Sequence, residues 1–538
     1  MGRMQFTPAV ALAGIALCAT PGFAQKEKEP LTDQERAIHV LSRLTYGPRP
    51  GDVERVLELG VDAWFEEQLA LDEASGVERE LGERKTLLLT SREIFEDYGY
   101  KPPVDAPRAE RVKALARREQ PRNELLEATA LRAVFGDRQL GEVVTDFWRN
   151  HFNVSYTKDG IALQLITEWD AAVLRPLALG PFGDLLTATV HSPAMLHYLD
   201  NAMSKRPPTD QKLAEIERKV RRETGSREAG EAAAALAGLR GVNENYAREL
   251  LELHTFGVDN GYKQEDVVAL AEILTGWSFQ AGAEGEWEFQ FNPDAHVQGS
   301  KRFLRQRIQG DAINGKTEGD EVLEILIEHK RTADFLATKL CQRLVSDEPS
   351  SRIVSDVASS LRRENGDVVE AIRTILEHSE FWDRETYRSK IKTPQEFVYS
   401  ALRATGAVVT DWDEVLKRLQ LMNQPIYHCD DPTGWSDLAE AWLDPGILAQ
   451  RWRFALDLAN NKLKGVRLPP YFFRDLNDDL PIAEWSRQLI SRVLPGGVGV
   501  RTQFALDSLV AKNRMEDSGS LQVRLLALIL GSPEFQRQ

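Results

Sequence analysis

Two glutamates three residues apart give this 538-residue chain its clearest potential for chemistry. Glu249 and Glu252 lie in the stretch NENYARELLELHTFG, residues 243–257. A cap at Asn243 and a stop at Gly257 predict a helix that ends near Phe256. On a helix, side chains at this spacing lie about 5–6 Å apart at Cβ. Such a pair suits a shared proton, with one pKa raised by the other carboxylate, or a divalent cation.

The glutamates belong to a polar stripe that also includes Asn245 and Arg248. Two interpretations of the stripe stay open. It is either a solvated face with an Arg248–Glu252 pair, or a cluster facing a cleft. His254 points away from the glutamates, between leucines, which favours a buried core histidine.

A second amphipathic helix is predicted over residues 140–153, LGEVVTDFWRNHFN. His151 shares its apolar face, so it is either a candidate catalytic group or, as we favour, a core histidine. Asp146 and Asn150 lie off that face and form a second polar rim. Asp200, Asn201 and His296 complete the candidate site, and His296 joins Glu249 and Glu252 as a candidate metal ligand.

Motifs for other chemistries are missing from the sequence. It has no P-loop, dinucleotide fingerprint, H-E-x-x-H or G-x-S-x-G, and without CxxCH we expect neither c-type haem nor an iron–sulfur cluster. A formal charge of −16 argues against a nucleic-acid partner, since phosphate contacts need clustered Lys and Arg. The cofactor is therefore left open, with a divalent cation as the candidate.

The first 24 residues resemble an export signal. Arg3 precedes a short apolar run, and small residues at Gly22 and Ala24 fit cleavage after Ala24. Residues 25–31 form a polar leader, and we expect no membrane-spanning segment after cleavage. In a periplasmic or extracellular protein, Cys341 and Cys429 are a candidate disulfide, the alternative being two separate buried thiols.

The rest of the chain predicts a mainly α fold, one large domain over residues 32–538. A helix over 109–134 is interrupted at Pro121, and residues 205–240 form a charged, alanine-rich insertion. Alternating aromatic residues predict a small β-hairpin-like excursion near 285–307. Further helices are expected at 317–329, 331–345, 351–363, 367–377, 390–405, 411–421, 446–461, 481–493, 499–512 and 519–531.

Several long segments of this sequence resemble the bacterial secreted proteins grouped as domain of unknown function 1800. They are LSRLTYGPRPGDVERVLELGVDAWFEEQL near the start, DFWRNHFNVS (146–155), SPAMLHYLDN (192–201), residues 243–277, HVQGSKRFL (296–304), FLATKLCQRLVSDEP (335–349) and WLDPGILAQRW (442–452). The resemblance implies a mostly helical secreted domain without an agreed activity, and another secreted protein as a partner. The chain departs from the family pattern at Val297, where an acidic residue is usual, and in the length of the 205–240 excursion.

Two hypotheses of function follow. The first is an enzyme that uses the carboxylate and histidine residues for hydrolytic or metal-assisted chemistry. The second is a non-enzymatic surface or assembly protein that acts with another secreted protein. Its recognition residues would be Trp and Arg side chains in turns: Trp148, Arg149, Trp277, Trp435, Trp442 and Trp452. A buried Glu249 would favour the enzyme, and a solvent-facing Glu249 the assembly protein.

Overall fold

The computed structural model describes residues 29–70, 76–238, 241–310, 315–474, 476, 481–512 and 518–538. The expected signal, residues 1–24, and leader residues 25–28 lie outside this part. The described residues are mainly helical and share one continuous apolar core, so the predicted large α domain is confirmed. None of their helices is long and apolar enough to cross a membrane.

The N-terminal half is a succession of helices. They are α1 (Asp33–Leu44), α2 (Asp52–Leu59), α3 (Val61–Ala70), α4 (Gly76–Leu81), η3 (Lys85–Leu88), α5 (Ser91–Tyr98), α6 (Arg108–Phe135), α7 (Gln139–His151), α8 (Ala162–Glu168), η4 (Trp169–Leu174), α9 (Arg175–Leu177), α10 (Phe182–His191), α11 (Pro193–Tyr198), η5 (Asn201–Met203), α12 (Asp210–Thr224), α13 (Arg227–Gly238), α14 (Asn245–Glu249), η6 (Leu250–Thr255) and α15 (Gln264–Ile273).

The C-terminal half is helical as well. Its helices are η7 (Pro293–Ala295), α16 (Lys316–Glu328), α17 (Lys330–Leu344), α18 (Ser351–Arg363), α19 (Val368–Glu377), η8 (Ser379–Trp382), α20 (Pro394–Thr405), α21 (Asp413–Leu421), η9 (Ala439–Trp442), α22 (Pro445–Ala459), α23 (Ile482–Val493), α24 (Val500–Lys512) and α25 (Ser518–Leu530).

Three small antiparallel sheets occur among the described residues. The strands are β1 (Trp277–Phe279), β2 (Phe289–Phe291), β3 (Lys301–Phe303), β4 (Gln306–Ile308), β5 (Val408–Val409) and β6 (Val466–Arg467). Strands β2 and β3 lie in the range predicted for a hairpin, 285–307. They do not pair with each other: β2 pairs with β1, and β3 with β4 across a tight turn.

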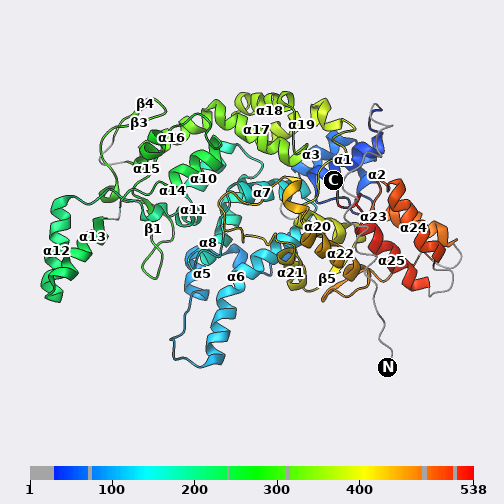
Figure 1. The fold of residues 1–538 in the computed structure, drawn as a ribbon, viewed down its shortest axis with the longest axis horizontal. Helices are drawn as coiled ribbons and strands as arrows, with labels where there is room; N and C mark the ends of the chain where they lie inside the picture. Colours follow the sequence, from blue (N-terminus) through cyan, green and yellow to red (C-terminus); the bar gives the residue numbers. More distant parts are fainter. Residues whose placement is uncertain are drawn as a thin grey trace.

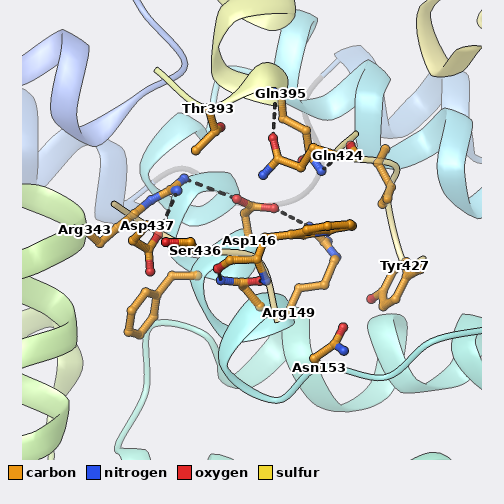
Figure 2. Close-up of a pocket in the computed structure, with 14 residues that line it drawn as sticks. Asp146, Arg149, Asn153, Arg343, Thr393, Gln395, Gln424, Tyr427, Ser436 and Asp437 are labelled. Atoms are coloured by element: carbon orange, nitrogen blue, oxygen red, sulfur yellow. Dashed lines mark hydrogen bonds and ion pairs between the residues drawn. The ribbon is translucent and has the colours of Figure 1, made fainter. Parts of the chain in front are cut away.

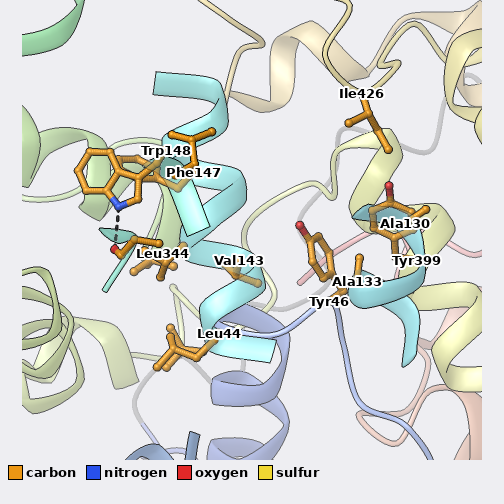
Figure 3. Close-up of a cluster of buried hydrophobic side chains, with 14 of the residues drawn as sticks. Leu44, Tyr46, Ala130, Ala133, Val143, Phe147, Trp148, Leu344, Tyr399 and Ile426 are labelled. Atoms are coloured by element: carbon orange, nitrogen blue, oxygen red, sulfur yellow. Dashed lines mark hydrogen bonds between the residues drawn. The ribbon is translucent and has the colours of Figure 1, made fainter. Parts of the chain in front are cut away.

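Helix α7 lies at the centre of the core (Figure 3). Its residues Val143, Phe147 and Trp148 are buried against side chains from both halves of the chain. The partners shown are Leu44 of α1, Ala130 and Ala133 of α6, Leu344 of α17, Tyr399 of α20 and Ile426. The indole of Trp148 donates to the Ala178 carbonyl at 2.9 Å. Each such large apolar side chain contributes about 1.5–3 kcal/mol by its burial.

Helices α12 and α13 form a hairpin that projects from one end of the molecule (Figure 1). No residue of α12 is buried, and the two helices approach closely at Gly230, where a Cβ would lie 2.7 Å from the Glu217 carbonyl oxygen. At its base the Lys205 amide donates to the Gly241 carbonyl at 3.3 Å. The hairpin accounts for most of the charged stretch 205–240, and its charged side chains remain in solvent.

Two helix predictions need correction. Helix α6 continues through Pro121 instead of breaking there. Proline removes one backbone donor, but the residues that follow it are buried, and Arg117 ties the preceding part to the Asp97 carbonyl at 2.9 Å. Helix α20 begins at Pro394, not at 390, because Thr393 caps it in a capping box with Glu396.

The predicted disulfide is wrong for this structure, since Cys341 and Cys429 are both free thiols. Cys341 lies on the buried face of α17, where burial raises its pKa to about 12. Cys429 lies in the loop after α21, and its carbonyl accepts a hydrogen bond from Asn153 at 2.9 Å. The loop is therefore anchored to the end of α7 by hydrogen bonds and needs no covalent link.

Candidate functional site

The segment with the two glutamates is a helix that widens after Glu249. Helix α14 passes into η6, a π-helical turn, instead of running regularly to Phe256. The amide of Phe256 donates to the Leu251 carbonyl at 2.8 Å, and the Thr255 hydroxyl to the Leu250 carbonyl at 2.7 Å. The backbone bond of Phe256 spans five residues, as the π geometry requires, and the Thr255 side chain adds a second bond across the turn. Single π turns of this kind are frequent at functional sites.

The polar stripe is partly solvated. Arg248 lies 3.3 Å from Glu252 and 3.2 Å from Glu244, and its side chain is 36% exposed. Ion pairs at this exposure contribute about 0–1 kcal/mol. The Arg248–Glu252 pair expected of a solvated face is thus present, and it neutralises one of the two glutamates.

Glu249 is the member of the stripe with altered acidity. It is half-buried, and burial raises its pKa. The charges of Glu252 and Asp431 raise the pKa further, while Arg248 opposes them. The sequence predicted that one glutamate would raise the pKa of the other, and the geometry supplies that effect together with burial.

The two histidines His151 and His254 are core residues. Nε2 of His151 lies 3.2 Å from the His254 carbonyl oxygen, and the ring is surrounded by Phe147, Trp148 and Phe152. Burial lowers the pKa of His151 well below its usual value and that of His254 to about 3. Both rings are therefore neutral and packed, as the core interpretation predicted.

Asp200, Asn201 and Asn245 come together at the end of α11. Asn245 donates to the Leu199 carbonyl at 3.2 Å, and Asp200 pairs with Lys158 at 2.5 Å. Asn201 is buried and donates to the carbonyls of Leu274 and Trp277. Asn201 is thus a fold-stabilising residue, while Asp200 and Asn245 stand close to the surface.

An open hollow of about 410 Å³ lies beside this group. Its walls are formed by polar and apolar residues from four separate segments of the sequence. They are Ser155, Thr157, Lys158, Tyr198, Leu199, Asn245, Asp430 and Pro432, which we call the outer hollow. The Asp430 carboxylate accepts from the hydroxyls of Thr157 and Ser155, the latter at 3.2 Å. The Thr157 bond is the main reason that the pKa of Asp430 is lowered.

A second, larger hollow of about 880 Å³ is lined by the residues just before Asn245. Asn243 and Glu244 line it, while the next residue, Asn245, lines the outer hollow. Lys205 and Gly241, the base of the α12–α13 hairpin, are also in its wall. The start of the segment that contains the glutamates therefore borders two open hollows.

Beneath the surface, a network of buried charges surrounds a small cavity of about 30 Å³ (Figure 2). Asp146 lies between Arg149, at 3.3 Å, and Arg343, at 3.2 Å. Burial raises the pKa of Asp146, and the two arginines oppose this shift. A water molecule requires at least about 10–15 Å³ of such space, so the cavity is of solvent size and cannot enclose a substrate.

The network extends to Asp170, which lies in the second π-helical turn, η4. Arg149 pairs with Asp170 at 2.8 Å, and the Tyr427 hydroxyl donates to the same carboxylate at 2.6 Å. Burial raises the pKa of Asp170, but the charges of Arg149 and Arg175 have the larger combined effect. The pKa of Asp170 is therefore lowered to about 2. On the other side, Arg343 contacts Glu396 at 3.1 Å.

A single loop, residues 422–438, connects the cavity with the outer hollow. It has no helix or strand over 17 residues, and loops of this length in compact domains are usually functional. Asn150 exchanges two hydrogen bonds with Trp435, at 2.6 and 2.7 Å. Asn153 donates to the Asp431 carbonyl at 2.8 Å. Tyr427 has a φ of +55°, a conformation that costs energy and occurs mostly at functional sites.

Sequence reasoning named Asp146 and Asn150 as a polar rim but missed the loop they contact. The available signals were the word DFWRNHFNVS, whose Asp146, Arg149, Asn150, Asn153 and Ser155 all belong to this region, and the turn-rich HCDDPTGWSD. From the segment HCDDPTGWSD, sequence analysis singled out only the cysteine and the tryptophan. An irregular loop has no periodicity that would indicate which residues it contacts.

His296 lies in a different cluster. It is buried, with Nδ1 2.9 Å from the Thr275 carbonyl oxygen and Nε2 3.2 Å from Glu318 and 3.1 Å from Lys301. Lys301 and Glu318 form an ion pair of 2.6 Å. His296 is thus not brought together with Glu249 and Glu252. Across the described ranges, no three His, Cys, Asp or Glu side chains are grouped to hold a metal ion.

Comparison with known proteins gives one result. No curated protein and no solved structure matches the chain. The profile of one family, described as protein of unknown function (DUF1800), matches residues 39–537. That range contains both hollows, the central cavity and every helix except the first turns of α1. The chain belongs to the DUF1800 family.

Proposed function

We propose that this protein is exported and binds a small polar ligand in the outer hollow. The observation that supports the proposal is the convergence of hydroxyl, amide, ammonium and carboxylate groups from residues 155–158, 198–199, 245 and 430–432 on one open space. A volume of about 410 Å³ lies in the range of small-molecule sites. Asp430, Asn245 and Thr157 accept and donate hydrogen bonds, which suits saccharides and short peptides.

Ligand-observed NMR with mono- and disaccharides and dipeptides tests the proposal. Thr157→Val and Asp430→Asn should weaken any binding about tenfold, because each leaves a polar partner unmatched at about 1–3 kcal/mol. Asp411→Asn is the matched control, since Asp411 pairs with the distant Lys464. Binding that is unchanged in both site variants would place the ligand elsewhere.

Hydrolysis of the bound molecule is a second candidate, favoured by the raised pKa of Glu249. Asp431, which contributes to that shift, lies between two residues of the outer hollow, Asp430 and Pro432. A raised pKa makes a glutamic acid a better candidate for a general acid. The test is a hydrolase panel with wild-type protein, Glu249→Gln and Glu252→Gln, together with metal analysis of all three. Equal activity in Glu249→Gln would rule out this role.

The assembly hypothesis draws less support from its named residues. Trp148, Trp277 and Trp442 are buried, and Trp435 is half-buried in the loop. Trp452 is 48% exposed, so of the five tryptophans it offers the most surface to a partner. Affinity capture with wild-type protein and Trp452→Ala compares this hypothesis with ligand binding.

A further inference from the structure

Lys392 is a buried lysine whose amine contacts no carboxylate in the part of the chain that the structure describes. It lies in the extended stretch before α20 and is 7% exposed. Its Nζ lies 3.1 Å from the Ser400 hydroxyl and 4.2 Å from the ring centroid of Phe535. Lys390, two residues earlier, is also buried but pairs with Asp347 at 2.5 Å. An unpaired ammonium is costly to bury, so the environment of Lys392 favours the neutral amine.

The charged groups around Lys392 strengthen this preference. Burial is the largest cause of a pKa lowered to about 7, and Arg388 and Arg451 lower it further, while Glu396 opposes them. Arg537 faces the same cavity from the C-terminal end of the chain. Cations thus outnumber carboxylates around the amine, and lysines in such surroundings are nucleophilic.

The amine borders a small cavity between α1, α20 and the loop after α23. Lys392, Ser400, Arg388 and Arg537 provide its polar lining, and its volume is about 30 Å³. Nη1 of Arg388 donates to the carbonyls of Gly496 and Gly497, both at 3.0 Å. Its Nη2 is buried and has no partner among the described residues. A buried donor without a partner calls for an acceptor in the cavity.

We propose that Lys392 binds carbon dioxide as a carbamate in this cavity. The neutral amine attacks the carbon of CO₂, a new N–C bond forms, one C=O π bond breaks, and the amine proton leaves to solvent. The product is a lysine carbamate anion, and no oxidant or reductant is required. Carbon dioxide has three heavy atoms, which is what a space of about one or two water molecules admits.

The surroundings favour the product over the starting amine. The carbamate oxygens are acceptors, and Arg388, which lines the same cavity, has an unpartnered donor in its buried Nη2. Hydrogen bonds between ionised partners are about twice as strong as neutral ones. The same cations that disfavour a protonated Lys392 therefore stabilise its carbamate.

The test uses the full-length protein with ¹³C-bicarbonate at pH 8. Carbamates are trapped by alkylation with triethyloxonium, and the modified peptide is located by mass spectrometry. We expect the label on Lys392 and none on Lys390, which serves as the internal control. The signal should rise with CO₂ and fall below the pH at which Lys392 becomes protonated.

Arg388→Gln removes the free donor but keeps the lysine, and should lose most of the trapped product while circular dichroism confirms the fold. A cavity that holds water only would leave Lys392 unlabelled in folded wild-type protein, and this result overturns the proposal. Equal labelling of Lys390 and Lys392 would overturn it as well. Neither result bears on the outer hollow, which is formed by other residues.

Discussion

The Arg–carboxylate pairs of the buried network and of the surface stripe differ sharply in how much of each side chain is exposed. Arg149 and Asp170 are each less than 10% exposed and share further partners. Arg248 and Glu252 are 36% and 20% exposed. Removing one partner of a buried pair leaves an uncompensated charge in the interior, whereas water replaces a lost partner at the surface.

Asp170→Asn should therefore destabilise the protein by about 3–5 kcal/mol, the cost of breaking a buried pair. Glu252→Gln is the control and should change stability by about 0–1 kcal/mol. Urea denaturation of both variants measures the difference. Similar values for the two would contradict the assignment of Asp170 to a buried network.

The same residue gives a pH prediction. The folded-state pKa of Asp170, about 2, lies below its ordinary value of 3.8. Its contribution to stability is fully present above pH 3.8 and is lost as the pH falls toward 2. The denaturation midpoint of the wild-type protein should exceed that of Asp170→Asn, and this difference should shrink as the pH falls from 3.8 toward 2. An advantage that stays constant from pH 6 to pH 2 would contradict it.

For Glu249, the pH dependence of the protein's stability has the opposite sign. Because burial and its acidic neighbours raise its folded-state pKa above the ordinary value of 4.5, its ionisation weakens the folded state progressively as the pH rises above 4.5. Glu249→Gln should melt at the same temperature as wild type near pH 4, and slightly higher at pH 7. Differential scanning fluorimetry at both values tests this. A lower melting temperature at pH 7 would show that the carboxylate is stabilised instead.

At the level of elements, the 422–438 loop depends on α7 for its shape. Asn150 and Asn153 bond its backbone at Trp435 and Cys429, and Gly434 allows the chain to pass close to α7. A Cβ at Gly434 would lie 2.4 Å from the Asn150 carbonyl oxygen. The π-helical turn η4 supplies Asp170, which fixes Tyr427 in its left-handed conformation.

Gly434→Ala should displace the loop as well as strain it. Its φ is +76°, and that of Gly225, in the turn of the α12–α13 hairpin, is +69°. Both substitutions add the cost of a left-handed alanine, about 1 kcal/mol, but a Cβ at Gly225 meets nothing within 4 Å. Thermal unfolding should show the larger loss for Gly434→Ala, and equal losses would mean that the loop adapts freely.

For the whole molecule, the body and the α12–α13 hairpin contribute differently to stability. No residue of α12 is buried, Leu236 of α13 is exposed, and the base of the hairpin is closed by the Lys205–Gly241 hydrogen bond. Figure 1 shows the hairpin at one end of the molecule, apart from α7. A hairpin of this kind adds surface for contacts without supporting the core.

Replacing residues 208–239 by a short glycine–serine linker should leave the melting temperature of the body nearly unchanged, since loop length alters closure entropy only slightly. Circular dichroism melting measures the effect. A shortened protein that fails to fold would show that the hairpin supports the core.

The sequence alone determined the fold class and the position of most helices in the C-terminal half. Helix 351–363 was predicted with the bounds that α18 has, and most others in the C-terminal half differ by one or two residues. The face of α7 with Leu140, Val143, Phe147 and His151 is buried as expected. These properties follow from a period of 3.6 residues, which local sequence records directly.

Only the tertiary structure decided which polar groups meet. Asn150 and Trp435 are 285 residues apart, and neither has a pattern that points to the other. The sequence therefore led to Glu249, Glu252 and His296 as one site, whereas in the fold His296 bonds to Glu318 and Lys301, and Asp431 is close enough to Glu249 to raise its pKa. Contacts across an irregular loop depend on how several helices pack together, and no single segment of the sequence predicts that packing.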